Sequence, residues 1–468
     1  MTFDIAIIGA GPAGMEAALL AKRHTDKILV LDSRPEPGGN VYAYVASNAR
    51  NFPDHFRRFD ASYTSGLMLV ERFLGSGVDY RPCSSVWHLD GTGQVAYRGP
   101  DGAHVVQARK IILCTGAYER PLPVPGWTLP GIMGVGAAQI ALKSSAVLPQ
   151  SPTVIIGNGP LPLLYARQLR RAGGKIDAFI IPKPKQTAPI VGAGLRAALI
   201  SPTNTARGLS MLVNRTLAGT RVVQNATSIG ITGQDKVEGV QFEASGKRIE
   251  LPAQAVLLHD GIIPDINISA GSGLDIDWSI QQQSWRPALD GTGQSSVQNI
   301  FVAGDAGGIA GATAAHLSGK RAALAAMVSL GLAAEGDLVA LTSQTGRDLR
   351  REIKLRTVLD QLYPTAFSNP SFADELTICR CEGVTAGDIR REIADMKNVN
   401  VDPNRLKSVL RCGMGPCQGR NCAQTVARLV TGELGTDIDR HSLPRTRAPY
   451  TQITLGEMAN LSMESGDE

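Results

Sequence analysis

The sequence predicts an α/β protein with two Rossmann-like dinucleotide-binding domains, followed by a small, helix-rich C-terminal domain. Three observations support this prediction. A glycine-rich turn follows an apolar strand near the N-terminus, a second turn of this kind lies in the middle of the chain, and most of the 7 cysteines gather near the C-terminus. At roughly 150 residues per domain, the 468 residues have room for about three domains.

The first nucleotide-binding unit is predicted at the N-terminus. The apolar run FDIAII leads into a turn with Gly9, Gly11 and Gly14, and MEAALLAKRH continues at a helical period. Such a turn needs one glycine for the bend, one for close approach of a pyrophosphate and one for helix–strand packing. Asp32 ends the next strand 18 residues after Gly14, where an acid holds a ribose hydroxyl. We expect a dinucleotide here; the alternative is that these glycines only form a turn.

A second, altered unit follows in the middle of the chain. The strand TVIIG is followed by Gly157 and Gly159, but Pro162 stands where the third glycine belongs. Proline is tolerated in a first helical turn, so the fold survives the change. The following strand ends at Pro182 without an acid for a ribose. We therefore expect a nucleotide-binding fold that has lost its nucleotide, with a 2′-phosphate contact from Lys183 and Lys185 as the alternative.

Two later motifs identify the first nucleotide. CTG stands at 114–116, and VAGD at 302–305 ends a strand with Asp305 at the start of a helix. Together with the N-terminal glycines these motifs resemble the glutathione-reductase-like flavoproteins, which implies FAD, with Asp305 contacting its ribityl and phosphate part. A helix N-cap is the alternative role of Asp305. The resemblance places these residues around the cofactor: Gly9, Gly11, Pro12, Ala13, Gly14, Asp32, Ser33, Gly39, Thr115, Gly116, Gly304 and Asp305.

The C-terminal cysteines predict a metal centre. They are Cys379, Cys381, Cys412, Cys417 and Cys422. Four thiolates from two short loops suit a [2Fe–2S] cluster, and neighbouring glycines let backbone amides turn toward its sulfurs. Structural zinc, which favours C-x2-4-C spacings, and uncoordinated thiols are the alternatives.

The cysteine pattern resembles the bacterioferritin-associated-ferredoxin type of [2Fe–2S] domain. This resemblance implies Cys379, Cys381, Cys417 and Cys422 as ligands and leaves Cys412 spare. The second pair is spaced C-x4-C instead of C-x2-C, so Cys412 in place of Cys417 or Cys422 stays open.

Several other features limit the function. No cysteine follows Gly39 closely and none lies in 121–378, which argues against a dithiol reductase, and we expect Cys83 and Cys114 to be buried. His316 is expected on a helix surface or in the core, with an approach to the flavin as the alternative. A net charge of +5 is too small for a nucleic-acid binder. With no signal sequence and no long apolar span, we expect a cytoplasmic protein, with peripheral attachment at the inner membrane face as a second option.

The expected domain boundaries follow from these motifs. An amphipathic helix at 347–363 carries Leu349, Ile353, Leu359 and Leu362 near one face and a solvated basic face. The expected parts are an FAD-binding domain at 1–120 and 255–335, a degenerate NAD(P)-binding-like domain at 121–254, a helical linker at 336–374, the cysteine domain at 375–432 and a C-terminal tail at 433–468 with frayed last residues.

The whole chain resembles one group of enzymes. The segments GAYERPLPVPGWTLPG, GMGPCQGRNC and RAPYTQITLGEMA are similar to those of the A (alpha) subunits of heteromeric flavin-dependent amino-acid dehydrogenases. This group includes opine oxidases, hydroxyproline and dye-linked proline dehydrogenases and the B subunit of hydrogen cyanide synthase. Asn40 is a departure, because the group often has glutamine there.

The resemblance implies a division of labour between subunits. A D-amino-acid-oxidase-like flavoprotein beta subunit would oxidise the amino acid or opine, so no catalytic base is assigned to this chain. This chain would pass the electrons through flavin and [2Fe–2S] to a quinone or another non-oxygen acceptor. Some alpha subunits of the group hold only an adenine nucleotide at the N-terminal site, with an extra FMN at the subunit interface, and a small third subunit is a further expected partner.

Two other functions stay open at this point. The first is a self-sufficient NAD(P)H-dependent flavin/iron–sulfur reductase, which a glycine at position 162 and an acid near 182 would have favoured. The second is a non-catalytic scaffold whose nucleotide and metal serve only folding. Fold analogy does not choose among opine, hydroxyproline, proline and glycine as the substrate.

Overall fold

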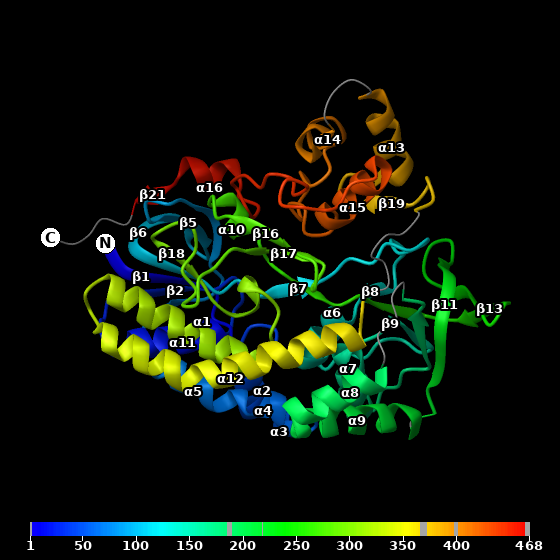
Figure 1. Ribbon diagram of the computed structural model, residues 1–468, viewed down its shortest axis with the longest axis horizontal. Helices are drawn as coiled ribbons and strands as arrows, with labels where there is room; N and C mark the ends of the chain where they lie inside the picture. The colour runs from blue at the N-terminus through cyan, green and yellow to red at the C-terminus, as the bar shows by residue number, and fades with distance from the viewer. Residues whose placement is uncertain (1, 185–189, 218, 366–371, 397–400, 464–468) are drawn as a thin grey trace.

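The computed structural model of the chain describes residues 2–184, 190–217, 219–365, 372–396 and 401–463. Two large sheets organise it, and a small helical domain stands at one end (Figure 1). Among the described residues, no helix is long and apolar enough to cross a membrane.

The first sheet has the strand order β3-β2-β1-β6-β5-β4, and β18 and β21 also pair with β6. Its strands are β1 (Thr2–Ile8), β2 (Ile28–Leu31), β3 (Asp79–Arg81), β4 (Ser85–Leu89), β5 (Gln94–Gly99), β6 (Gly102–Leu113), β18 (Ile300–Val302) and β21 (Ser462–Met463). β1, β2, β6 and β18 run parallel, so their carboxyl ends meet at one edge, where ligands of such sheets bind.

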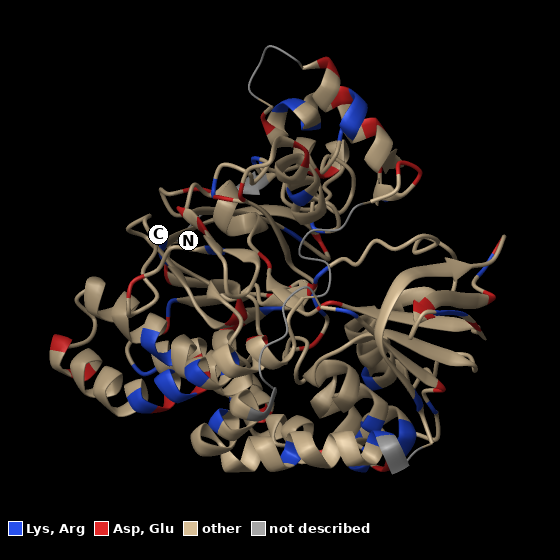
Figure 2. Cartoon of the chain, turned by 45° about the vertical axis from the view of Figure 1, so that its right-hand side comes forward, with Lys and Arg blue, Asp and Glu red and all other residues tan. Residues whose placement is uncertain are grey.

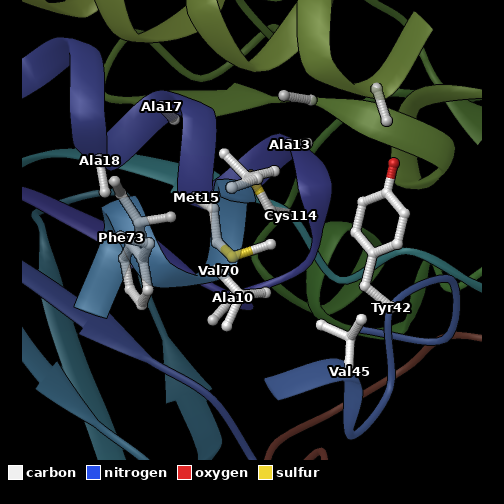
Figure 3. Close-up of a cluster of buried hydrophobic side chains, with 14 of the residues drawn as sticks. Ala10, Ala13, Met15, Ala17, Ala18, Tyr42, Val45, Val70, Phe73 and Cys114 are labelled. Carbon is white, nitrogen blue, oxygen red and sulfur yellow. The ribbon is translucent and has the colours of Figure 1, made fainter. Parts of the chain in front are cut away.

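Helices cover the faces of this sheet. They are α1 (Pro12–Ala21), α2 (Val45–Asn51), α3 (Pro53–Arg57), α4 (Ala61–Thr64), α5 (Gly66–Leu74), α10 (Asn267–Gly271), the short 3₁₀ helix η1 (Gly304–Gly307) and α11 (Ala312–Ser329). α1 and α11 pack closely, because a Cβ atom at Gly319 would lie 2.2 Å from the carbonyl oxygen of Ala13. Figure 3 shows the core beneath α1, where Met15 lies beside Val70.

The second sheet has the order β13-β12-β11-β10-β9-β14-β8. Its strands are β8 (Ile132–Gly134), β9 (Thr153–Gly157), β10 (Ala178–Pro182), β11 (Arg221–Thr232), β12 (Gly239–Ala244), β13 (Lys247–Pro252) and β14 (Ala255–His259). The helices that accompany it are α6 (Val135–Ser145), α7 (Pro160–Arg171), α8 (Ile190–Ile200) and α9 (Pro202–Leu217). Both predicted nucleotide-binding units therefore fold as strand, turn and helix.

Two strand pairs connect these layers. β7 (Ala117–Glu119) pairs with β15 (Ile262–Pro264), and β16 (Ile276–Ser279) pairs with β17 (Ser284–Pro287). The long helix α12 (Glu335–Leu362) then crosses the molecule in contact with α11 and α8 (Figure 1).

The cysteine domain projects from one end of the molecule (Figure 1). It consists of the strand pair β19 (Thr377–Cys379) and β20 (Val384–Thr385) and the helices α13 (Ala386–Asp395), α14 (Pro403–Leu410) and α15 (Ala423–Leu434). The chain then returns to the first sheet through α16 (Leu455–Ala459) and β21, and the Tyr450 hydroxyl donates to the oxygen of Leu89 at 3.2 Å. The tail thus ties the cysteine domain to the first sheet.

The structure confirms the fold class and changes two details of the sequence analysis. Cys83 is exposed in a turn with φ of +53°, whereas Cys114 is buried as expected. The buried face of α12 is formed by Leu355 and Val358, while Ile353 is 49% exposed. The helix continues for three turns before residue 347, and its contacts with α8 and α11 decide which face is covered. The domain boundaries stay predictions, and the last five residues lie outside the described residues.

The helices α8 and α9 carry Arg196, Arg207 and Arg215 and no Asp or Glu. Over most of the rest of the chain, Lys and Arg residues are mixed with Asp and Glu residues (Figure 2). This agrees with the small net charge of +5.

Candidate functional site

The glycine-rich turn after β1 lies at the carboxyl edge of the first sheet. Gly9 has φ of +107°, and a Cβ atom there would lie 2.4 Å from the carbonyl oxygen of Cys114. A Cβ atom at Gly14 would lie 1.9 Å from the oxygen of Gly9. Both positions therefore require glycine. α1 begins at Pro12 without a side-chain cap, which leaves the N–H groups of Ala13 and Gly14 available to an anion.

Asp32 stands at the end of β2 beside this turn. Its Oδ2 accepts a hydrogen bond from the backbone N–H of Ala10 at 2.5 Å, and its Oδ1 accepts one from the backbone N–H of Arg34 at 2.8 Å. Burial raises the pKa of Asp32, while these two hydrogen bonds oppose that rise. Ser33 beside it is exposed. The carboxylate is thus fixed in place at the point where an adenosine ribose lies in this fold.

Gly39 closes the other side of the turn. A Cβ atom on it would lie 3.0 Å from the Cα atom of Gly11, so the two backbones face each other without side chains between them. Asn40 next to it donates from Nδ2 to the oxygen of Ala117 at 3.0 Å. The two glycines form a cradle of bare backbone, which a dinucleotide requires.

The CTG and VAGD motifs also lie at the carboxyl edge of the first sheet. Thr115 donates from Oγ1 to the oxygen of Asp265 at 3.0 Å, and Gly116 has φ of +72°. The N–H of Gly304 donates to Oγ of Ser318 at 2.9 Å. Asp305 accepts hydrogen bonds on Oδ1 from the N–H groups of the two residues before α11, at 3.0 and 3.1 Å. Asp305 therefore organises the loop before α11, which is close to the capping role considered from the sequence.

A polar network that the sequence did not predict lies at this edge. The hydroxyl of Tyr42 lies 3.1 Å from Nε2 of His316, and Nδ1 of His316 lies 3.4 Å from Oε1 of Glu16. Figure 3 shows the Tyr42 hydroxyl pointing toward the ribbon of α11. Glu16 is buried on α1, and Nζ of Lys320 lies 3.4 Å from its other oxygen. A buried acid within an otherwise apolar helix is the one sequence signal that points to this network.

A histidine side chain lies against the glycine turn of the second nucleotide-binding unit. Gly159 has φ of +140°, α7 begins after it, and Pro162 is buried in the first turn, as the sequence predicts. A Cβ atom at Gly159 would lie 3.4 Å from Nε2 of His259, so the imidazole lies against the loop. His259 contacts Oε1 of Glu119 through Nδ1 at 2.7 Å. Lys183 is exposed, and Lys185 lies outside the described residues.

The five C-terminal cysteines come together in the cysteine domain. The thiol of Cys379 is hydrogen bonded to those of Cys412 and Cys422, and the thiol of Cys417 to those of Cys422 and Cys381. These contacts lower the pKa of Cys379 and Cys417 and raise the pKa of Cys412 and Cys422. Cys379 and Cys422 are buried, whereas Cys381 is exposed. The group therefore has one buried edge and one open edge.

Backbone amides point at these sulfurs. Cys379 accepts hydrogen bonds from the N–H groups of Gly413 and Glu382, and Cys417 accepts them from Gly419 and Asn421. Gly413 and Gly419 have φ of +81° and +84°, a backbone conformation that favours glycine. Such amide–sulfur contacts tune iron–sulfur clusters, and they agree with the expectation from the glycines.

The linked cysteine thiols and their amide donors suit a cluster of two irons. A [2Fe–2S] cluster takes two cysteines on each iron, so its ligands need not meet at one point. The bare glycine cradle fits FAD, and the linked thiols with their amide donors fit a [2Fe–2S] cluster.

Hydrogen bonds join the two sites. Arg420, in the loop of residues 411–422 that carries Cys417 and Cys422 (the cluster loop), donates from Nε to Oδ2 of Asp265 at 3.1 Å. Asn267 donates from Nδ2 to the oxygen of Gln418 at 2.9 Å. Trp127 donates from Nε1 to the oxygen of Thr377 at 2.8 Å. The cluster loop thus contacts the segment of Asp265 and Asn267. This segment follows β15, the strand that pairs with β7 directly after the CTG turn (Cys114, Thr115 and Gly116).

Comparisons with known proteins agree with this geometry. Residues 377–431 match the BFD-like [2Fe-2S] binding domain. The opine oxidase A subunit of Rhizobium meliloti is 38% identical, over 98% of this chain and 88% of that protein. The HcnB subunit of hydrogen cyanide synthase of Pseudomonas protegens is 29% identical over 96% of this chain and 97% of that protein. L-proline dehydrogenase from P. horikoshii has the same fold, with a TM-score of 0.70 at 20% identity, over 98% of this chain and 79% of that one.

Residues 3–319 match the family described as pyridine nucleotide-disulphide oxidoreductase. This match implies FAD, and the BFD-like domain implies a [2Fe–2S] cluster, as the sequence predicted. The chain therefore belongs to the pyridine nucleotide-disulphide oxidoreductase family, in the group represented by the opine oxidase A subunit, and is an oxidoreductase that joins a flavin site to an iron–sulfur domain.

Proposed function

We propose that this chain is the electron-transfer alpha subunit of a heteromeric dehydrogenase that oxidises the CH–NH bond of an amino acid or opine. A D-amino-acid-oxidase-like beta subunit oxidises the substrate, and this chain passes the electrons to a quinone or another non-oxygen acceptor. The single observation that supports this most is the hydrogen-bonded contact between the cluster loop and the segment of Asp265 and Asn267, which follows β15 and is bonded to the CTG turn.

The two groups supply complementary redox chemistry. Oxidation of a CH–NH bond to an imine releases two electrons and two protons, FAD accepts electrons in pairs, and a [2Fe–2S] cluster carries them singly. The role of this chain is then to bind FAD and the cluster, to shield them from water and to hold them close together. The buried edge formed by Cys379 and Cys422 and the open edge at Cys381 suit entry on one side and exit on the other.

The proposed binding residues are those that the sequence identified. FAD is held by Gly9, Gly11, Pro12, Ala13, Gly14, Asp32, Ser33, Gly39, Thr115, Gly116, Gly304 and Asp305. The cluster is held by Cys379, Cys381, Cys417 and Cys422, and Cys412 is a buried neighbour of Cys379.

The NAD(P)H-dependent reductase is less well supported. His259 lies against Gly159 in the place where a pyrophosphate would approach the backbone. β10 ends at Pro182, and no acid follows it in the described residues up to Pro184. A reductase needs to bind a nucleotide at this edge. In the described residues, this unit offers neither an open glycine turn for the phosphates nor an acid after β10 for the ribose.

An anaerobic absorbance spectrum of the purified chain tests the proposal. We expect flavin and cluster bands that NADH leaves unchanged and dithionite bleaches. Rapid bleaching by NADH would establish the reductase, and a colourless protein with neither flavin nor iron would establish the scaffold. Addition of an opine or amino acid to the chain alone should change nothing, because the substrate is oxidised in the partner.

A further inference from the structure

We infer that Arg420 and Asp265 are positioning residues that dock the cluster loop on the CTG turn and so set the geometry for electron transfer between the two sites. This inference rests on the proposed function. Neither residue touches a reacting atom in this account. Their role is to hold one redox module against the other.

Asp265 belongs to the flavin side of the contact. It follows β15, whose partner β7 directly continues the CTG turn. Its backbone N–H donates to the oxygen of Gly116 at 3.0 Å, and its own carbonyl oxygen accepts from Oγ1 of Thr115 at 3.0 Å. Two residues of the CTG turn are therefore bonded to the main chain of Asp265, which fixes the position of its carboxylate.

Arg420 belongs to the cluster side. It lies between Cys417 and Cys422, and its Nη1 lies 3.4 Å from the carbonyl oxygens of Cys417 and Tyr450. Its Nε donates to Oδ2 of Asp265 at 3.1 Å. One guanidinium thus contacts a proposed cluster ligand, the returning tail and the flavin-side strand. Its planar fork of donors suits this role, which a lysine ammonium does not reproduce.

The ion pair between them is partly shielded from water. The side chains of Arg420 and Asp265 are 24% and 21% exposed. Charged hydrogen bonds in such surroundings are stronger than those of a fully exposed pair. Oδ1 of Asp265 also accepts from the backbone N–H of Asn267 at 3.2 Å, and Asn267 donates to Gln418 of the cluster loop. The carboxylate is therefore held from both sides.

The space beside this link is small. A cavity of about 40 Å³ lies between the modules, and it is lined by Tyr118 of β7, Asn267, Cys412, Cys422 and Gln418 among others. Tyr118 follows Gly116 by two residues and faces the cysteines across this cavity. A small shift of the cluster loop would increase the distance between Tyr118 and the cysteines. Displacements of about 1 Å are enough to slow reactions that depend on fixed geometry, so loss of this link should affect electron transfer.

The experiment uses the full chain with FAD and cluster bound. Flavin is reduced by a light flash under anaerobic conditions with EDTA as the electron donor, and cluster reduction is followed by its absorbance and its electron paramagnetic resonance signal. The variants are Arg420→Gln and Asp265→Asn, singly and together. Arg391→Gln is the matched control, because Arg391 also pairs with an aspartate of the cysteine domain but is 72% exposed on α13, away from the contact.

We expect full cluster content in both single variants and flavin-to-cluster transfer slowed about tenfold or more, equivalent to about 1.4 kcal/mol in the docked population. The double variant should be no slower than the worse single variant, because both substitutions break one link. The control should transfer at the wild-type rate.

Wild-type rates in both variants would overturn the inference. Loss of the cluster in both would also overturn it, since the residues would then build the cluster site instead of docking it. Failure of transfer in the wild-type chain would overturn the proposed function itself, and this outcome is distinct because it needs no variant.

Discussion

Lys143 on α6 donates from Nζ to the main-chain oxygen of Asn40 at 2.9 Å. A second hydrogen bond goes to the oxygen of Val41 at 3.0 Å. The helix that covers the second sheet is thereby tied to the segment after Gly38 and Gly39, beside the proposed flavin site. Lys143 is 3% exposed, and burial lowers its pKa to about 7.

Replacing Lys143 by methionine should remove a pH dependence of stability. Between pH 7 and about 10 the unfolded chain binds a proton on this lysine that the folded chain has largely lost, so the free energy of unfolding rises with pH. From pH 7 to 9 the lysine should contribute a rise of about 2 kcal/mol, since one pKa unit corresponds to about 1.4 kcal/mol. Urea unfolding at both pH values measures it.

The variant Lys143→Met should show a smaller rise than the wild-type chain by this amount. The control is Lys175→Met, since Lys175 is a 69% exposed lysine paired with Asp177. Equal rises in the wild-type chain and in Lys143→Met would show that Lys143 keeps its proton in the folded state.

Replacing Asp32 by asparagine should weaken FAD binding. The carboxylate accepts N–H groups on both oxygens, and an asparagine amide would turn a donor toward one of them. An unmatched buried donor costs about 1–3 kcal/mol, or roughly 5- to 150-fold in the dissociation constant. Flavin fluorescence on dilution measures the release.

The control Asp26→Asn changes an exposed aspartate that pairs with Lys22. It should retain FAD as the wild-type chain does. Retention of FAD by Asp32→Asn would place the adenosine away from the end of β2.

Substitution of a cluster ligand should affect the cluster more than substitution of Cys412. Cys412→Ser should keep iron and sulfide at the wild-type ratio, because Cys412 is assigned as a buried contact of Cys379. Cys422→Ser should lose most of the cluster or shift its absorbance strongly, since oxygen is a poor replacement for a thiolate ligand. Iron and sulfide analysis with visible spectra measures both. If Cys412→Ser lost the cluster and Cys422→Ser retained it, Cys412 would be the ligand and Cys422 the spare neighbour.

The contact between α1 and α11 should not tolerate a methyl group. A Cβ atom at Gly319 would lie 2.2 Å from the oxygen of Ala13, so Gly319→Ala should lower the free energy of unfolding by about 1–3 kcal/mol. The control Gly208→Ala lies within α9 with no atom inside 4 Å, and alanine there should stabilise by about 0.5–1 kcal/mol. Thermal unfolding distinguishes the two. A neutral Gly319→Ala would mean that the helices separate easily.

The sequence predicts the parts of this protein that depend on local patterns. The glycines at 9, 11 and 14 and the proline at 162 fix a turn and a helix start, and the structure has both as expected. Cys379 and Cys422 are 43 residues apart. Their convergence was still predictable, because five cysteines in one short part of a chain indicate a shared metal site.

The long-range polar contacts were not predictable. Arg420 and Asp265 are 155 residues apart, and Lys143 and Asn40 are 103 apart. Periodicity reports which face of an element is buried, but the partner of a buried charge depends on how loops from separate layers meet. The same limit explains Cys83, whose exposure depends on the turn between β3 and β4, and the buried face of α12, which contacts with α8 and α11 determine.

The most direct test of the account follows the cluster in the complex of this chain with its beta subunit. The complex is mixed anaerobically with an opine or amino acid substrate, frozen, and examined for the reduced [2Fe–2S] signal by electron paramagnetic resonance. We predict that the signal appears with substrate and does not appear with NADH. A signal with NADH but not with substrate would contradict the account, because electrons would then enter through the second nucleotide-binding unit of this chain.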